Sequence, residues 1–264
     1  MKLGFIGCGN MASAIMSGII SNGLIQADEI IGADVFAPSK EKAKATLGIQ
    51  IAESNTEVVQ KSDAFVLSIK PQFYAQVIAE IKDYVKENQI IITLAPGKTL
   101  KWLEEQFGKP VKVVRTMPNT PAMVQEGMTA ACASTSVTTE ELAYVCDILK
   151  AFGDVEVVPE KLMDAVVAVS GSSPAYVFMM IEAMADAAVA EGMPRNQAYK
   201  FAAKAVMGSA KMVLETGKHP GELKDMVCSP GGTTIEAVKV LEETGFKGAL
   251  MQAMEVCAEK SRSL

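Results

Sequence analysis

The sequence lacks the cysteine pairs on which cross-linked and zinc-bound domains depend. Its cysteines are odd in number and include no CxxC pair: Cys8, Cys132, Cys146, Cys228 and Cys257. This pattern argues against a disulfide framework and against a zinc cluster. A chain of 264 residues buries enough apolar surface to fold without such links. We therefore expect no metal site and a reducing, cytoplasmic setting.

Blocks of basic residues are also missing. The formal net charge is −6, and lysine and arginine are scattered along the chain. A surface for nucleic acid would have to be built against this overall negative field. We therefore expect no nucleic-acid partner.

An unbroken apolar run of membrane-spanning length is absent from the N-terminal region. No charged residue lies between Lys2 and Asp28, but five glycines and several polar residues interrupt the segment. A bilayer span needs about 20 consecutive, mainly apolar residues. We expect a buried strand and helix here, with neither an export signal nor a membrane anchor.

What is present in the first half is an alternation of short apolar runs and helical patterns. The expected strands are residues 3–7, 30–36, 49–52, 64–69, 90–94 and 111–117, and the expected helices are residues 11–23, 39–48, 72–88 and 98–108. Strands that are apolar throughout are typical of a parallel sheet covered on both faces. Residues 128–134 and 154–158 read as further strands around a helix. We predict an α/β fold, with a Rossmann-type, doubly wound dinucleotide-binding domain over residues 1–160.

The second half is predicted to be entirely helical, over residues 161–264. Ser173 suits an N-cap, Gly192 a helix end, and Pro194 the start of a second long helix that ends near Gly217. Residues 165–181 carry no charge and are apolar around most of the helix circumference. Such a helix has to be buried on all sides. About 100 residues cannot surround it, so we expect a substrate-binding domain that also forms an obligate homodimer.

A glycine motif follows the first strand. Gly7, Gly9 and Ala12 in GFIGCGNMASAIMSG have the spacing of the dinucleotide fingerprint, with alanine at the third position. Gly7 would make the tight turn, Gly9 would let the backbone approach a pyrophosphate, and Ala12 would let helix and strand pack closely. The pyrophosphate would then lie at the helix N-terminus.

The choice between NAD and NADP is left open by the second strand. Asp34 is at about the right distance to hold a ribose hydroxyl pair, which favours NAD, but Val35 and Phe36 extend the apolar run and would place it inside the sheet. Ser39 and Lys40 beyond the strand suit a 2′-phosphate. We expect NADPH as the cofactor, with NADH possible.

Acid catalysts are scarce. The sole histidine, His219, reads as part of an exposed loop. Reduction of a ketone calls for a proton donor, whereas a protonated imine already carries the charge that attracts hydride. The scarcity favours imine reduction, although Lys70 keeps ketone reduction open.

Five segments together resemble the pyrroline-5-carboxylate reductase family along essentially the whole chain. They are GFIGCGNMASAI, SIKPQ, TMPNTPAMVQEG, SGSSPAY and PGELKDMVCSPGGTTIEAVKVLE. The resemblance implies NAD(P)H-dependent reduction of 1-pyrroline-5-carboxylate to L-proline, the final step of proline biosynthesis. It also implies a helical C-terminal domain that interlocks with its partner, in dimers that sometimes form larger rings. Asp34 departs from the family pattern and leaves the cofactor preference in doubt.

The resemblance, the glycine motif and the loops at the strand ends give the candidate residues. Thr234 is expected beside the substrate ring nitrogen, as the catalytic residue. The expected substrate-binding residues are Glu160, Asp225, Ser229, Gly231, Gly232 and Thr233. The expected cofactor-binding residues are Gly7, Gly9, Asn10, Met11, Ser39, Lys40, Asn55, Ser68, Ile69, Lys70, Pro71, Ala95, Gly97 and Asn119.

Two other classes of protein fit parts of the pattern. A 3-hydroxyacid dehydrogenase would share the Rossmann domain but would use a lysine in the first long helix of the second domain, and residues 174–191 contain none. A non-catalytic dinucleotide sensor would have no reason to place an anion-binding turn at CSPGGTT. A tight turn with a threonine cap is the purely structural interpretation of that segment.

Overall fold

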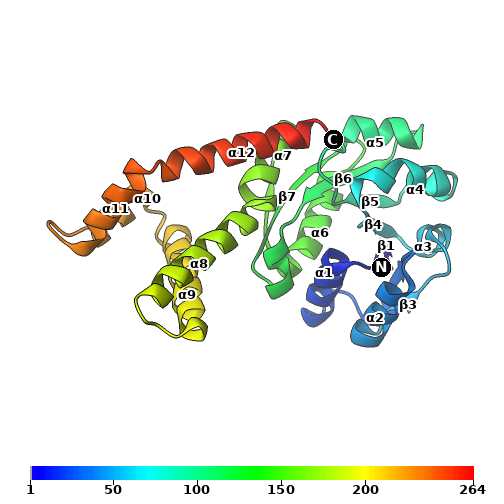
Figure 1. Ribbon diagram of the computed structural model, residues 1–264. Coiled ribbons are helices and arrows are strands. Elements are labelled where there is room, and N and C mark those ends of the chain that lie inside the picture. The colour runs from blue at the N-terminus through cyan, green and yellow to red at the C-terminus, as the bar shows by residue number, and fades with distance from the viewer. Residues whose placement is uncertain (1) are drawn as a thin grey trace. The chain divides into compact units, whose positions relative to one another are not determined.

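A single sheet organises the N-terminal part of the computed structural model, which describes residues 2–264. Within that range the sheet has eight strands in the order β3-β2-β1-β4-β5-β6-β7-β8 (Figure 1). The strands are β1 Leu3–Ile6, β2 Ile30–Ala33, β3 Gln50–Ile51, β4 Ala64–Leu67, β5 Ile90–Thr93, β6 Lys112–Met117, β7 Gly127–Ala133 and β8 Gly153–Val157. β1 to β6 are mutually parallel, β7 is antiparallel to β6, and β8 is parallel to β7.

The strand order confirms the predicted doubly wound fold. β3-β2-β1-β4-β5-β6 is the order of a Rossmann sheet, which reverses direction of winding between β1 and β4. Four central strands, β1, β2, β4 and β5, are buried at every position. This burial explains why their sequences are continuously apolar rather than alternating.

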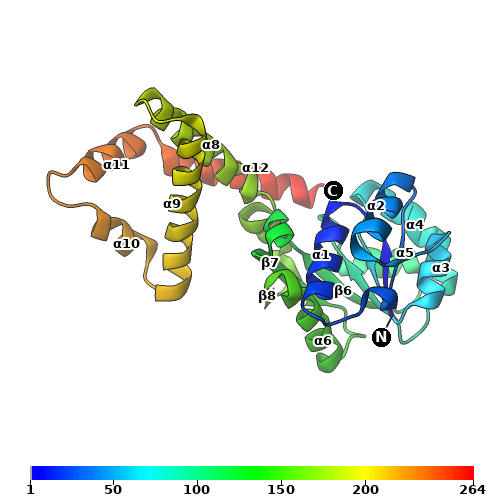
Figure 2. The ribbon, with the colours of Figure 1, turned by 90° about the horizontal axis from the view of Figure 1, so that it is seen from below.

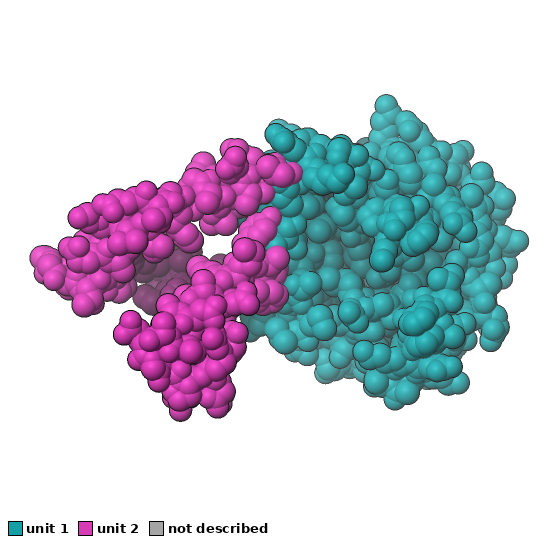
Figure 3. Space-filling model, in the orientation of Figure 1, with its two compact units in different colours: residues 1–172, 257–264 teal, residues 173–256 magenta. Residues whose placement is uncertain are grey.

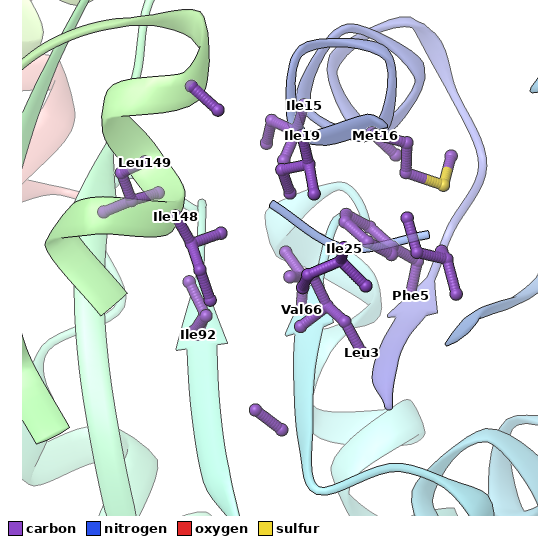
Figure 4. Packing of buried hydrophobic residues seen from close by; sticks show 14 of the residues in the cluster. Leu3, Phe5, Ile15, Met16, Ile19, Ile25, Val66, Ile92, Ile148 and Leu149 are labelled. Carbon is purple, nitrogen blue, oxygen red and sulfur yellow. The ribbon is translucent and has the colours of Figure 1, made fainter. Parts of the chain in front are cut away.

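Helices cover both faces of this sheet (Figure 1 and Figure 2). They are α1 Asn10–Ser21, α2 Ala37–Leu47, α3 Asn55–Lys61, α4 Tyr74–Ile81, α5 Leu100–Phe107 and α6 Thr139–Leu149. Figure 4 shows side chains of α1 and α6, among them Ile15 and Ile148, directed at apolar residues of β1, β4 and β5. α3, α4 and α5 bury their apolar stripes against the opposite face. In a sheet covered on both faces in this way, ligands bind at the carboxyl ends of the strands.

The C-terminal part of the chain is helical, as predicted. Its helices are α7 Met163–Val166, α8 Ser173–Ala190, α9 Arg195–Thr216, α10 Pro220–Val227, α11 Thr233–Glu243 and α12 Phe246–Arg262. The fold divides into two compact units, residues 1–172 with 257–264 and residues 173–256, coloured separately in Figure 3. α9 ends at Thr216, and its C-cap Gly217 adopts the left-handed conformation with φ +63°, so this end agrees with the sequence prediction.

α8 begins at Ser173, so the predicted helix start agrees to within one residue. Other helical turns precede it: a 3-10 turn from Glu160, α7, and a π-helical turn over Val167–Gly171, with a bend at Ser172 before α8. Taken together, the segment Glu160–Ala190 is long and apolar enough to cross a membrane by length and composition alone, and 11% of its most apolar window is buried within the chain.

The second unit leaves large apolar side chains on its surface. Within α8 only Ala185 is buried, while Phe178 and Met179 are 63% and 69% exposed. Phe201 on α9 and Leu241 on α11 are exposed as well. Isolated soluble domains rarely expose this much apolar surface, and such patches usually mark a protein interface.

Candidate functional site

The turn between β1 and α1 has the geometry of a phosphate-binding loop. Gly7 has φ +96°, and a Cβ built on it would lie 2.2 Å from the Ser68 carbonyl oxygen. Only glycine fits such a turn. Ala12 is completely buried against the sheet, which keeps α1 close to it. The small residues therefore do in this structure what the spacing predicts.

Gly9 leaves an open cradle at the start of α1. It is the N-cap of that helix, no side chain caps this end, and a Cβ on Gly9 would meet no atom within 4 Å. The first amides of α1 consequently have no intrahelical acceptor. Amides and helix dipole together attract an anion. The residues fit a dinucleotide pyrophosphate, since a side chain at Gly9 would fill the space that the phosphates need.

Asp34 lies directly after β2, so the expectation that the strand continues through Val35 and Phe36 is wrong. β2 ends at Ala33, and Val35 and Phe36 are 99% and 62% exposed. The Asp34 carboxylate accepts the Cys8 N–H on Oδ2 at 2.7 Å and the Phe36 N–H on Oδ1 at 2.8 Å. The acid is therefore outside the sheet, at the carboxyl end of β2.

Two neighbouring cavities open at the carboxyl ends of the parallel strands. The first, of about 350 Å³, is lined by Gly9, Asn10, Met11, Ser68, Ile69, Lys70, Leu94, Met117, Pro118, Asn119, Thr120 and Gly171. The second, of about 280 Å³, is lined by Ile6, Gly7, Asp34, Val35, Asn55, Ile69, Phe73, Gln76, Val77 and Glu80. They share Ile69 and flank the glycine loop. Predicted cofactor residues from four separate segments thus meet at the switch point of the sheet.

Other predicted cofactor residues lie outside these two cavities. Ser39 and Lys40 are half-buried in the first turn of α2. Pro71 begins a 3-10 turn after Lys70, and Ala95 is buried in the core below α4 and α5. Gly97 has φ +74°, and a Cβ on it would lie 2.5 Å from Cβ of Leu264. Gly97 therefore serves the close approach of the chain end near residue 264.

Asn119, in the wall of the first cavity, joins two other segments through hydrogen bonds. Its Oδ1 accepts the Met128 N–H at 2.9 Å, and its Nδ2 donates to Ser170 Oγ at 3.2 Å. Met117 and Gly171 complete this wall, and a Cβ on Gly171 would lie 2.6 Å from Cε of Met117. Sequence reasoning placed Asn119 here but missed Met117 and Gly171, although both belong to the segments TMPNTP and SGSSPAY that it singled out.

Glu160 lies at a different place in the first unit. Its Oε1 accepts hydrogen bonds from Arg115 Nη1 at 2.9 Å and from the Leu100 N–H at 2.7 Å. The carboxylate thus joins β6 to the start of α5. Its predicted contact with the substrate stays a prediction.

Ser229, Gly231, Gly232, Thr233 and Thr234, but not Glu160 or Asp225, lie together in the second unit, from the turn after α10 to the start of α11. Gly231 has φ +66°, the Gly232 N–H donates to the Ser229 carbonyl at 3.0 Å, and Gly232 is the N-cap of α11. The alternative of a threonine cap is wrong, because no side chain caps α11 and Thr233 and Thr234 form its first turn. The turn therefore presents a helix N-terminus without its own acceptor.

Two side chains of the α10 region, Asp225 and His219, already have partners. Asp225 at the end of α10 pairs with Lys224 at 2.6 Å, and both are exposed. His219 is exposed in the loop between α9 and α10, as predicted, where it is the N-cap of α10 and its Nδ1 accepts the Gly221 N–H at 3.0 Å. His219 therefore has a structural task.

Electrostatics keep the buried thiols of the first unit neutral. Burial raises the pKa of Cys8 to about 12, with a further contribution from the Asp34 charge. Burial likewise raises the pKa of Cys132 to about 11, helped by Glu160. A thiolate nucleophile is consequently not available at either position near neutral pH.

Comparisons with known proteins cover both parts of the chain. Residues 160–264 match the family model for pyrroline-5-carboxylate reductase dimerisation, and residues 2–97 match the model for NADP oxidoreductase, coenzyme F420-dependent. The pyrroline-5-carboxylate reductase of Escherichia coli (strain K12) is 53% identical over 100% of this chain and 98% of its own, and that of Methanosarcina acetivorans is 43% identical over 100% and 97%. The crystal structure of pyrroline carboxylate reductase from Plasmodium falciparum with NADP bound has a TM-score of 0.92 at 33% identity, over 100% of this chain and 97% of that one. With full-length relatives at this identity, the chain belongs to the pyrroline-5-carboxylate reductase family.

Proposed function

We propose that the protein reduces 1-pyrroline-5-carboxylate to L-proline, with NADPH as the electron donor and NADH as a possible substitute. The observation that carries this proposal is the 53% identity to a reductase of that name over the whole chain. The similarity to a structure with NADP bound supports the cofactor. NADPH, when bound, supplies the hydride that reduces the C=N bond.

The glycine loop and the two cavities are the proposed cofactor site. Gly9, Asn10 and Met11 present the N-terminus of α1 to the pyrophosphate. The cavity beyond the loop, which Asn55 and Ile69 line, is proposed for the adenosine half, and the cavity that holds Lys70 and Asn119 for the nicotinamide half. Ser39 and Lys40, in the first turn of α2, are proposed for the 2′-phosphate.

The turn before α11 is the proposed carboxylate site. Gly231 and Gly232 bring backbone N–H groups to the N-terminus of α11, which adds the positive end of its dipole. Ser229, Thr233, Asp225 and Glu160 are proposed as further substrate-binding residues. Thr234, half-buried in the first turn of α11, is proposed to orient the imine nitrogen with its hydroxyl.

Orientation rather than strong acid catalysis explains this arrangement. A protonated imine already attracts electrons, and its reduction leaves a neutral amine instead of an alkoxide. Holding the substrate carboxylate and ring nitrogen in place then accounts for much of the rate. The lysine that a 3-hydroxyacid dehydrogenase would use is absent from α8, whose residues Ser173–Ala190 are all described.

Self-association through the helical part is proposed to cover its exposed apolar side chains. The dimerisation model that matches residues 160–264 and the exposure of Phe178 and Met179 support a homodimer or a ring of dimers. Burial in such an interface also accounts for the apolar segment Glu160–Ala190 without a membrane. We propose residues 1–160 as the dinucleotide-binding domain, residues 161–264 as the substrate-binding and dimerisation domain, and the cytoplasm as the location, with no nucleic-acid partner.

Oxidation of NADPH and of NADH by the purified protein tests the proposed reaction. We expect turnover with pyrroline-5-carboxylate, faster with NADPH, and none with small 3-oxo acids. Formation of L-proline in the same mixture, measured by chromatography, identifies the product. Absence of turnover of the pyrroline with either cofactor would contradict the proposal, and turnover of 3-oxo acids instead would favour the hydroxyacid dehydrogenase.

A further inference from the structure

Asp34 connects two loops at the carboxyl end of the sheet. It follows the last residue of β2, and its Oδ2 accepts the Cys8 N–H at 2.7 Å, just beyond the end of the neighbouring strand β1. Its Oδ1 accepts the Phe36 N–H at 2.8 Å, in the segment that opens α2. One side chain thereby fixes both the glycine loop and the entry to the next helix.

The backbone hydrogen bonds of the glycine loop show which part of the loop Asp34 holds. The Gly7 N–H donates to the Ala33 carbonyl at 2.7 Å, and the Cys8 N–H donates to Asp34. The first two amides of the loop are thus directed at the end of β2. Gly9 and Asn10, the next two residues, line the first cavity. Asp34 therefore holds the loop at Cys8, the last residue before those that line the cavity.

The bond to Cys8 is of a strong kind. A carboxylate that accepts a backbone N–H makes a charge-assisted hydrogen bond, which is about twice as strong as a neutral one. Cys8 is buried, with its Sγ 3.7 Å from the Ala33 carbonyl oxygen. Partial burial limits the competition of water for the Asp34 Oδ2 contact.

An acid at the end of the second strand often holds the ribose hydroxyls of NAD and so selects against NADP. In this chain each carboxylate oxygen of that acid is already bonded to an N–H of its own chain. We propose that Asp34 is a positioning residue that locks the glycine loop, and that it does not set the preference between NADPH and NADH. This inference rests on the proposed dinucleotide function.

A residue that holds the glycine loop and a residue that selects between the two riboses have different effects on the affinities for NADPH and NADH. The glycine loop faces the pyrophosphate, which NADPH and NADH share. A looser loop therefore weakens the binding of both cofactors by the same factor. Loss of a residue that selects the NAD ribose weakens the binding of NADH and leaves that of NADPH unchanged or stronger, because only the ribose substituent distinguishes the two molecules.

Asp34→Ala and Asp34→Asn test the lock, with Asp63→Ala as the matched control. Asp63 Oδ2 accepts the Lys2 N–H at 2.9 Å, beside the opposite end of β1 and away from the loop. In Asp34→Ala we expect the dissociation constants for NADPH and NADH, measured by fluorescence titration, to rise together by about tenfold. Asp34→Asn keeps one carbonyl acceptor and should fall between wild type and Asp34→Ala. Asp63→Ala should bind both cofactors like wild type.

Amide hydrogen exchange of the nucleotide-free protein gives a readout that needs no cofactor. We expect the Cys8 amide to exchange faster in Asp34→Ala than in wild type, and equally in Asp63→Ala. A shift of the NADPH to NADH affinity ratio by tenfold or so would overturn the proposal and place Asp34 against the ribose. Unchanged exchange of the Cys8 amide in Asp34→Ala would overturn it too. Equal losses of cofactor affinity in Asp34→Ala and Asp63→Ala would also overturn it, because the cause would then be general destabilisation. Failure of the wild type to bind either cofactor would contradict the proposed function, while the exchange measurement would still decide on the lock.

Discussion

Arg115 on β6 and Glu160 form an ion pair at 2.9 Å in which the arginine side chain is only 5% exposed and the glutamate is 33% exposed. Glu160 Oε1 also accepts the Leu100 N–H at the start of α5. The pair therefore neutralises a buried guanidinium and fixes a helix N-terminus with the same oxygen. This arrangement gives Glu160 a structural task beside its predicted contact with the substrate.

Replacing Glu160 by alanine should lower the stability of the first unit. The change leaves the Arg115 charge buried without its partner, which costs about 3–5 kcal/mol in fully buried pairs. Because Glu160 keeps part of its exposure, we expect a loss of about 2 kcal/mol. The midpoint of thermal unfolding, followed by circular dichroism, measures it.

Glu156→Ala is the control for that prediction, because Glu156 is an exposed glutamate on β8. It should melt like the wild type. If Glu160→Ala also melts like the wild type and only raises the KM for the pyrroline, the residue acts on the substrate and its structural role is refuted.

Gly7 and Gly9 allow folding and cofactor binding to be separated within one loop. Gly9→Ala adds a methyl group in open space at φ −70°, so the fold should tolerate it. The methyl group stands where the pyrophosphate approaches, so the dissociation constant for NADPH should rise by about tenfold or more. Calorimetric titration measures the affinity.

Gly7→Ala should destabilise the fold as well as weaken cofactor binding. Its Cβ would lie 2.2 Å from the Ser68 carbonyl oxygen at φ +96°, so the turn has to distort. We expect a fall of at least about 2 kcal/mol in unfolding free energy, together with lost binding. Equal thermal stability of the two variants would show that the turn is not strained in the way the geometry indicates.

The sequence predicted the parts of this fold that depend on continuous burial. Residues 64–69 and 90–94 read as strands because strands covered on both faces are apolar throughout, and β4 and β5 lie within them. The same criterion wrongly extended the second strand past Asp34, because Val35 and Phe36 are apolar but exposed. α3 was missed because Asn55–Lys61 is short and mainly polar. Apolar content reports burial only on average, so it cannot locate a strand end.

Contacts between distant segments were the other part of the site that the sequence could not predict. The motif spacing identified Gly7 and Gly9, because a tight turn requires glycine locally. It could not give the bond between Asn119 and Ser170, since those residues are 51 positions apart and the π-helical turn that aims Ser170 has no clear sequence signal. The antiparallel direction of β7 was not predicted for a similar reason, because an apolar run carries no information on strand direction.

Thr234 should matter for turnover rather than for cofactor binding. It lies in the first turn of α11, away from the glycine loop in sequence, and is half-buried. Thr234→Ala removes the hydroxyl proposed to orient the imine, so we expect kcat with the pyrroline to fall by about tenfold or more. Binding of NADPH, measured by titration, should change by less than about twofold.

Two further variants sharpen that test. Thr234→Ser keeps the hydroxyl and should restore much of the rate, and Thr233→Ala removes the neighbouring hydroxyl of the same helical turn as a control. A loss of NADPH affinity equal to the loss of kcat would mean that Thr234 faces the nucleotide.

The raised pKa of Cys8 should lower the free energy of unfolding in alkaline solution. Burial and the Asp34 charge raise the pKa of its thiol from 9.0 to about 12 in the folded protein. Between these values the folded state keeps a proton that the unfolded state releases, so the free energy of unfolding falls as the pH rises. The slope is at most about 1.4 kcal/mol per pH unit for this group. Below about pH 9 the contribution is fully present.

Cys8→Ala removes that contribution and should flatten the alkaline fall. Denaturant titrations at about pH 8.5 and about pH 10.5 give the change in unfolding free energy for each protein. Because Cys132 and Tyr74 also have raised pKa values through burial, only the difference between variant and wild type is diagnostic. We expect the variant to lose about 2 kcal/mol less than the wild type over this interval, and Cys228→Ala to behave like the wild type. Parallel losses in all three proteins would mean that Cys8 ionises equally well in the folded and unfolded chain, and that its burial beside Asp34 does not hold the proton.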